Sequence, residues 1–147
     1  MSSEEKGQWV YLVVFVVTYG AYLVITLGQL GHTAPADIDY VPTMLWAIGI
    51  GIALVIVGRI VVEIVGRISS EVAGNVEGQE ADVRDRDIGR FGEYFGGTVL
   101  GVGMVVPFAL TLAESDYFWI ANAMYLVFGV SAAVGAAVKL VAYRRGF

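Results

Sequence analysis

The sequence reads WVYLVVFVVTYGAYLVITLGQL from Trp9 to Leu30, an apolar run without a charged residue. As a helix rising about 1.5 Å per residue, these roughly 22 residues cover the roughly 30 Å hydrocarbon core of a bilayer. A secretory signal peptide is the competing interpretation, but its apolar core of about 7–15 residues normally follows a basic segment. Here Glu4 and Glu5 outnumber Lys6 ahead of the run. We therefore interpret it as a first membrane-spanning helix.

The composition of the whole chain also indicates lipid as its solvent. Of the 147 residues, 57% are hydrophobic, and the mean hydropathy is +0.71, which is more apolar than an ordinary soluble domain. Long segments carry few charges or none, as a bilayer requires, because ionisable groups are costly there. Most charges gather in three stretches: Ser2–Lys6, Arg67–Glu93 and Arg144–Arg145.

Apolar runs of spanning length occur four times along the chain. We predict helices over about 9–30, 43–67, 91–113 and 117–143, with a cytoplasmic loop over about 68–90. The short connections before the second and fourth runs make their flanking helices antiparallel neighbours. The expected fold is all-α, an integral membrane up-down four-helix bundle that forms a single domain over 1–147.

The basic residues predict an orientation. The segments 31–42 and 114–116 contain no Lys or Arg, so every basic residue falls on the opposite side of a four-crossing topology. Because Lys and Arg near helix ends favour the cytoplasmic side, we expect both termini in the cytoplasm of a cell with this protein in its membrane. The basic residues are Lys6, Arg59, Arg67, Arg84, Arg86, Arg90, Lys139, Arg144 and Arg145.

Several kinds of chemistry are excluded or unsupported. The chain has no cysteine, which excludes disulfides, thiolate metal sites and cysteine nucleophiles. His32 is the only histidine, which excludes bis-histidine haem and multi-histidine zinc sites within one chain. The net charge of −5 argues against nucleic acid as a partner. Phosphate-loop, metalloprotease and nucleophile-elbow motifs are missing, so we expect no cofactor, no metal and no enzymatic activity.

Polar side chains share one face of the first predicted helix. Tyr11, Thr18, Tyr22 and Gln29 lie within about 40° of one another at 100° per residue, and Asn122 supplies a polar group on the last helix. In hydrocarbon, such groups prefer to face other helices, where hydroxyls and amides find partners. Interhelical hydrogen bonding is the favoured interpretation, and a polar permeation path is the alternative.

The third predicted helix is rich in glycine. It contains Gly92-x-x-x-Gly96 and Gly97-x-x-x-Gly101, patterns that let helix backbones approach closely. They favour tight packing within the chain or between two copies of it, so a homo-oligomer stays open. Pro107 is expected to kink the same helix in its outer half.

Four ionisable residues lie inside the predicted spans, all toward the cytoplasmic ends: Arg59, Glu63, Glu93 and Lys139. The spacing of Arg59 and Glu63 allows an i,i+4 pair, while the long arginine stem could instead extend toward the interface. An ion-pair network in one layer is the favoured interpretation. A functional charge cluster is the alternative, because ionisable groups in a membrane usually have a role.

The segment between the second and third helices has features of its own. Ile68, Val72 and Val76 follow helical spacing, which predicts that the second helix continues into the cytosol. Asp82 to Ile88 reads DVRDRDI, a helix start with Asp82 as its cap. We interpret it first as a solvated helix start and next as a protein-docking element, whereas its spacing does not specify a carboxylate metal site. The docking candidates are Asp82, Arg84, Asp85, Arg86, Asp87 and Arg90.

The second half of the chain resembles a loose group of small four-helix membrane proteins of bacteria and archaea that have no known function. That group carries a D-x-R-D-R-x-I-like segment before helix three and a second hairpin with a basic tail. The matching stretches here are Asp82–Ile88, Phe118–Ala123 and Lys139–Arg145. The resemblance implies four helices and no particular activity.

Two functions fit these observations. The first is an accessory or regulatory subunit that binds a cytosolic or membrane protein through its cytoplasmic face and needs no catalytic residues. The alternative is a small oligomeric transporter or channel, because four short helices rarely enclose a pore alone. A third possibility, an enzyme that acts on lipid at the cytoplasmic interface, would need a cluster of Asp and Glu residues that the cytoplasmic loop could supply, although no motif in it indicates one.

Overall fold

The protein is built almost entirely of helices. The computed structural model describes residues 3–73 and 79–145, with side chains for 5–68 and 83–145. Its elements are α1 (Ser3–Leu30), the short 3-10 helix η1 (Pro35–Asp37), α2 (Tyr40–Ala73), α3 (Gln79–Gly103), α4 (Val105–Leu112) and α5 (Tyr117–Arg145).

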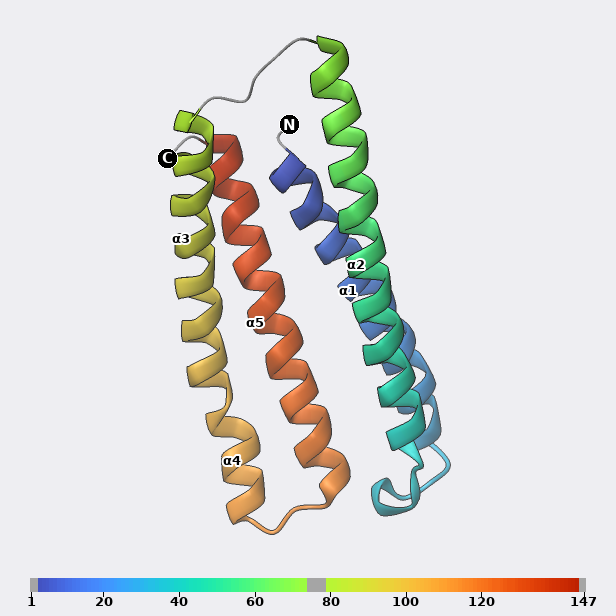
Figure 1. The fold of residues 1–147 in the computed structure, drawn as a ribbon. Helices are drawn as coiled ribbons and strands as arrows, with labels where there is room; N and C mark the ends of the chain where they lie inside the picture. Colours follow the sequence, from blue (N-terminus) through green and yellow to red (C-terminus); the bar gives the residue numbers. More distant parts are fainter. Residues whose placement is uncertain (1–2, 74–78, 146–147) are drawn as a thin grey trace.

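Four helices are long and apolar enough to cross a membrane: α1, α2, α3 with α4 as one span, and α5. They run up and down side by side (Figure 1). The predicted all-α, up-down bundle is therefore confirmed. The start of α1, the end of α2, the start of α3 and the end of α5 lie together at what we call the basic end. The η1 loop and the turn before α5 lie at the opposite, loop end.

The helices at the basic end are longer than expected. Of the segment 68–90, predicted as a loop, residues 68–73 belong to α2 and 79–90 to α3. The apolar spacing of Ile68 and Val72 indicated this continuation, and Val76 lies outside the described residues. Asp82 stands inside the first turn of α3 and not at its cap, which corrects the predicted helix start. An acidic residue there still interacts favourably with the helix dipole.

The sequence predicts a kink at Pro107, and the structure has a break in the helix just before this residue. α3 ends at Gly103, Met104 forms a turn, and α4 begins at Val105. Pro107 has no N–H to donate to the carbonyl of Gly103, and its ring would collide with that carbonyl in a regular helix. The backbone stays connected because the Met104 N–H donates to Leu100 O over 2.9 Å and the Phe108 N–H to Met104 O over 3.2 Å.

The bundle consists of two hairpins joined through α5. The principal helix contacts are α3 with α5, α1 with α2, and α1 with α5. In the most apolar window of α5, 33% of residues are buried in the protein, against 0% for α2. α5 is thus the central helix, and α2 is a peripheral helix held mainly by α1, as the arrangement in Figure 1 shows.

Glycines let α3 approach α5 until their backbones touch. A Cβ on Gly96 would lie 3.1 Å from Ser131 O, and one on Gly135 would lie 3.1 Å from Gly92 O. The Ser131 hydroxyl also donates to Gly96 O over 2.8 Å. The first glycine pattern of α3 therefore packs within the chain. At Gly97 and Gly101 an added Cβ would meet nothing within 4 Å, so the second pattern packs against nothing among the described residues.

Replacing Gly135 by leucine tests this contact. We expect Gly135→Leu to lower the free energy of unfolding by about 1–3 kcal/mol or more, because the side chain must push α3 away. Gly101→Leu is the matched control, since that position is open. Thermal unfolding in detergent, followed by circular dichroism, measures both. Equal melting temperatures for the two variants would contradict the packing described here.

Candidate functional site

The polar face predicted on α1 divides into groups with different surroundings. Tyr22 is 1% exposed, and its hydroxyl donates to Asn122 Oδ1 on α5 over 2.7 Å. The Asn122 amide donates to Phe118 O one turn earlier, over 2.8 Å. Thr18 and Gln29 instead donate to carbonyls of their own helix, Val14 O at 2.8 Å and Ile25 O at 3.4 Å. Only part of the face thus links α1 to α5.

An aromatic cluster surrounds the Tyr22 hydrogen bond. The ring of Tyr125 lies edge-on to Tyr19, with centroids 5.0 Å apart, and to Tyr22 at 5.2 Å. Tyr19 also stacks on Phe15 at 5.3 Å. Sequence reasoning missed Tyr19 and Tyr125, although each lies three residues from a member of the predicted face. These rings fill the space between α1 and α5.

Three of the four predicted intramembrane charges meet at the basic end. Arg59 reaches α1, where a Cβ added to Gly7 would lie 3.6 Å from the guanidinium Nε. Lys139 Nζ lies 4.0 Å from Glu93 Oε1. Glu63 is directed elsewhere and pairs with Arg67 at 2.6 Å, with both side chains more than 60% exposed. Glu63 lies four residues from both Arg59 and Arg67 on α2. Both spacings allow an ion pair, and the sequence alone does not choose between them.

Arg59, Glu93 and Lys139 line a hollow of about 350 Å³, which we call the polar hollow. Every spanning helix contributes to its wall. The Lys139 side chain is 19% exposed and that of Glu93 is 77% exposed, so the cation lies inside and the carboxylate lies at the rim. The other lining residues are Gln8, Tyr11, Gly92, Gly96, Gly97, Ser131, Ala132, Gly135 and Ala136.

The glycines of the α3–α5 contact explain why the hollow exists. A Cβ on Gly92 would overlap the aliphatic stem of Lys139, so the lysine side chain extends across bare backbone. Glycine at this place makes room for the lysine stem, which a larger side chain would displace. Among the residues that line the hollow, Arg59 and Lys139 are cationic and Glu93 is anionic.

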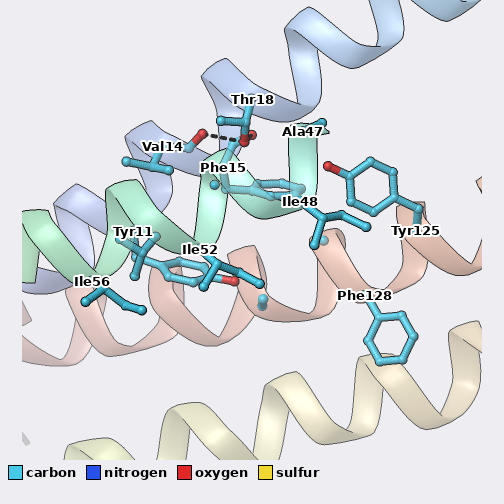
Figure 2. Close-up of a pocket in the computed structure, with 14 residues that line it drawn as sticks. Tyr11, Val14, Phe15, Thr18, Ala47, Ile48, Ile52, Ile56, Tyr125 and Phe128 are labelled. Carbon is cyan, nitrogen blue, oxygen red and sulfur yellow. Dashed lines mark hydrogen bonds between the residues drawn. The ribbon is translucent and has the colours of Figure 1, made fainter. Parts of the chain in front are cut away.

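An apolar groove of about 380 Å³ continues from the polar hollow. It runs between α1, α2 and α5, and Figure 2 shows Phe15, Ile48, Ile52 and Phe128 on its walls. Tyr11 and Ala132 line both the groove and the hollow, so the two spaces adjoin. The groove exists because α2 packs on α1 and stands apart from α5. Sequence analysis missed this feature, because it depends on how closely each pair of helices packs.

A second charged contact joins the two ends of the described chain. Glu5 is 8% exposed, and its Oε1 lies 3.7 Å from Arg144 Nε on α5. The Arg144 guanidinium also lies 5.6 Å from the centre of the Trp9 ring, a cation–π distance. The contact binds the start of α1 to the end of α5. Sequence reasoning missed it, since no local spacing relates residues so far apart.

The predicted docking residues lie on the first turns of α3. Arg84, Arg86, Asp87 and Arg90 are exposed, and Asp85 is half-buried. The Asp82 side chain lies outside the described residues. Ile88 between them is 0% exposed and holds this part of α3 in the bundle. Within the described part of the chain, no three His, Cys, Asp or Glu side chains gather as a metal site would require.

Comparisons with protein-family models, with curated proteins and with solved structures found no match to this chain. The resemblance to small four-helix membrane proteins therefore stays a prediction.

Removing the Tyr22 hydroxyl tests the hydrogen bond between α1 and α5. We expect Tyr22→Phe to lower the free energy of unfolding by about 0.6–1.7 kcal/mol, the range typical of hydrogen bonds within membrane bundles. In an Asn122→Leu background the same change should cost clearly less, because its partner is gone. Tyr117→Phe is the control, since Tyr117 is 85% exposed. Additive effects of the two changes would disprove the coupling.

Proposed function

We propose that the protein is an accessory or regulatory subunit of a cell membrane that binds a protein partner through its cytoplasmic face. The observation that carries the proposal is the exposed charged side chains on the first turns of α3. No catalytic arrangement is needed for this role. The partner is a cytosolic protein or the cytosolic part of a membrane protein.

The lengths of the helices support the presence of a surface outside the lipid. α2 has 34 residues, so it is about 51 Å long, and roughly 20 Å of it exceeds the hydrocarbon core. In Figure 1 the excess lies at the basic end, where α2 reaches beyond the start of α1. The first turns of α3 stand at the same end of the bundle, short of the end of α2.

The distribution of charge supports a cytoplasmic position for the basic end. The connections at the loop end, residues 31–39 and 113–116, contain no Lys or Arg. The docking candidates alternate between acidic and basic side chains. They would therefore select a partner with a complementary arrangement of charges more than one with a large opposite net charge. Val83, which is 53% exposed beside them, adds an apolar contact point. A mixed patch of this kind suits a protein surface better than an anionic membrane, which recruits runs of Lys and Arg.

A small oligomeric transporter or channel is the alternative, and the polar hollow is the observation that favours it. Within one chain, the Tyr19, Tyr22 and Tyr125 rings occupy the bundle interior beyond the hollow. A pathway would then have to form between copies, for which the open Gly97–Gly101 surface is suited. The subunit proposal requires no such rearrangement.

The orientation can be measured with introduced cysteines, because the chain has none of its own. In whole cells, we expect a membrane-impermeant maleimide to label Ala36→Cys and Asp116→Cys at the loop end. Arg90→Cys and Arg145→Cys at the basic end should react only after the membrane is permeabilised. Labelling of the basic end in intact cells would overturn the proposed topology.

The docking surface can be tested by photo-crosslinking in cells from a benzoyl-phenylalanine placed at Val83. We expect one protein adduct, identified by mass spectrometry, whose yield falls at least about 10-fold when Arg84 and Arg86 are both changed to Glu, since like charges across an interface are strongly unfavourable. Arg145→Glu is the matched control. An unchanged yield would refute this surface, and an adduct formed only with a second copy would favour the oligomeric alternative.

A further inference from the structure

We propose that the polar hollow and the apolar groove together bind one anionic phospholipid, with its phosphate beside Arg59 and Lys139 and an acyl chain between α2 and α5. The proposal is independent of the partner described above. It rests on two adjoining spaces, one cationic and one apolar, that share Tyr11 and Ala132.

The two spaces have the dimensions of an amphiphile site. Each measures within the roughly 300–1,000 Å³ typical of small-molecule pockets: about 380 Å³ for the groove and about 350 Å³ for the hollow. Along α2, the distance from Ala47 to Arg59 is about 18 Å at 1.5 Å per residue. This length is close to the roughly 15 Å that one leaflet contributes to the hydrocarbon core.

The polar groups of the hollow suit a phosphate. Arginine offers a planar fork of donors that matches phosphate oxygens, and lysine supplies a second positive charge from the other side of the space. The Ser131 hydroxyl donates to Gly96 O, so Arg59 and Lys139 are the groups of the hollow whose charge an anion would meet. Glu93 lies 4.0 Å from Lys139 and competes with an anion for it, but its position at the rim keeps the carboxylate away from the interior.

The groove suits an acyl chain better than a helix of a partner protein. Its lining includes Val14, Phe15, Ile52, Ile56 and Phe128, and Figure 2 shows that these apolar side chains come from three helices. A helix with side chains is about 10–12 Å wide, and the groove is closed on one side by α1. The basic hollow at its end then selects a headgroup with negative charge.

Native mass spectrometry of the full chain in detergent, titrated with phosphatidylglycerol, tests the headgroup contacts. We expect Arg59→Gln and Lys139→Gln each to weaken binding about 10-fold, the effect of losing one hydrogen bond to a charged group. Arg59→Lys should keep most of the affinity, and Arg145→Gln is the matched control. Glu93→Gln should strengthen lipid binding, because it removes the carboxylate that competes for Lys139. If the Glu93–Lys139 pair only supports the structure, this variant should bind the lipid more weakly.

The acyl-chain contact has its own variants. Ala132→Trp should fill the junction of hollow and groove and abolish lipid binding without any change of charge. Ala137→Trp, on the exposed side of the same helix, should bind as the original protein does. Circular dichroism and gel filtration show which variants fold. If Arg59→Gln does not fold, Lys139→Gln and Ala132→Trp decide the question.

Comparison of ligands decides whether the lipid itself is recognised. Phosphatidylglycerol should bind clearly more tightly than phosphatidylcholine, and inorganic phosphate should compete poorly. Equal binding of the two lipids would overturn the role of Arg59 and Lys139. If inorganic phosphate bound as tightly as phosphatidylglycerol, and Ala132→Trp did not change the affinity, the hollow would be a site for a free anion instead. Equal affinities for Arg59→Gln and Arg145→Gln would place the lipid elsewhere.

Discussion

In lipid, helices gain no hydrophobic free energy by burying their apolar surfaces against one another, so close packing and hydrogen bonds must hold them together. The backbone contact of α3 and α5 at Gly96 and Gly135 is the strongest instance here. It is reinforced by the hydrogen bond from Ser131 to Gly96 O. Because α5 is fixed on α3 in this way, its remaining face is available to α1. There Gly129 admits the ring of Phe15 and Asn122 accepts the Tyr22 hydroxyl.

The same contact sets the character of the candidate site. The bare backbone at Gly92 makes room for the stem of Lys139, and Lys139 and Arg59 both line the hollow. Meanwhile α2 finds its partner in α1, where Gly58 receives Val10. α2 therefore stands apart from α5, and the apolar groove is the space left over. α3 therefore packs tightly on α5, whereas α2 does not. The polar hollow and the apolar groove adjoin as a result of this difference.

The sequence predicted much of the fold because hydropathy and helix-breaking residues act locally. The spans, the break before Pro107 and the continuation of the second helix past Ile68 all follow from short-range patterns. Contacts between distant segments did not follow. Both glycine patterns of α3 look alike in sequence, yet only the one at Gly92 packs on α5, since helix rotation and not spacing selects the contact.

The candidate site was partly visible in the sequence. Arg59, Glu93 and Lys139 were chosen for their depth, and the structure brings them to one hollow. Glu63 had an equally good spacing to two arginines and pairs with Arg67. The sequence indicated no partner for Glu5, and the structure places it beside Arg144. The orientation, the docking role and the family resemblance depend on a membrane, a partner and relatives, and they stay predictions.

The central position of α5 has a consequence for how the protein is made. During synthesis α1 and α2 emerge first and form one hairpin, and the span of α3 and α4 follows. The principal contacts that unite these parts are made by α5, the last span along the described chain. Until α5 is in place, the α1–α2 hairpin and the span of α3 and α4 lack the principal contacts that join them. We therefore expect the bundle to form late, when α5 joins the hairpin of α1 and α2 to the span of α3 and α4.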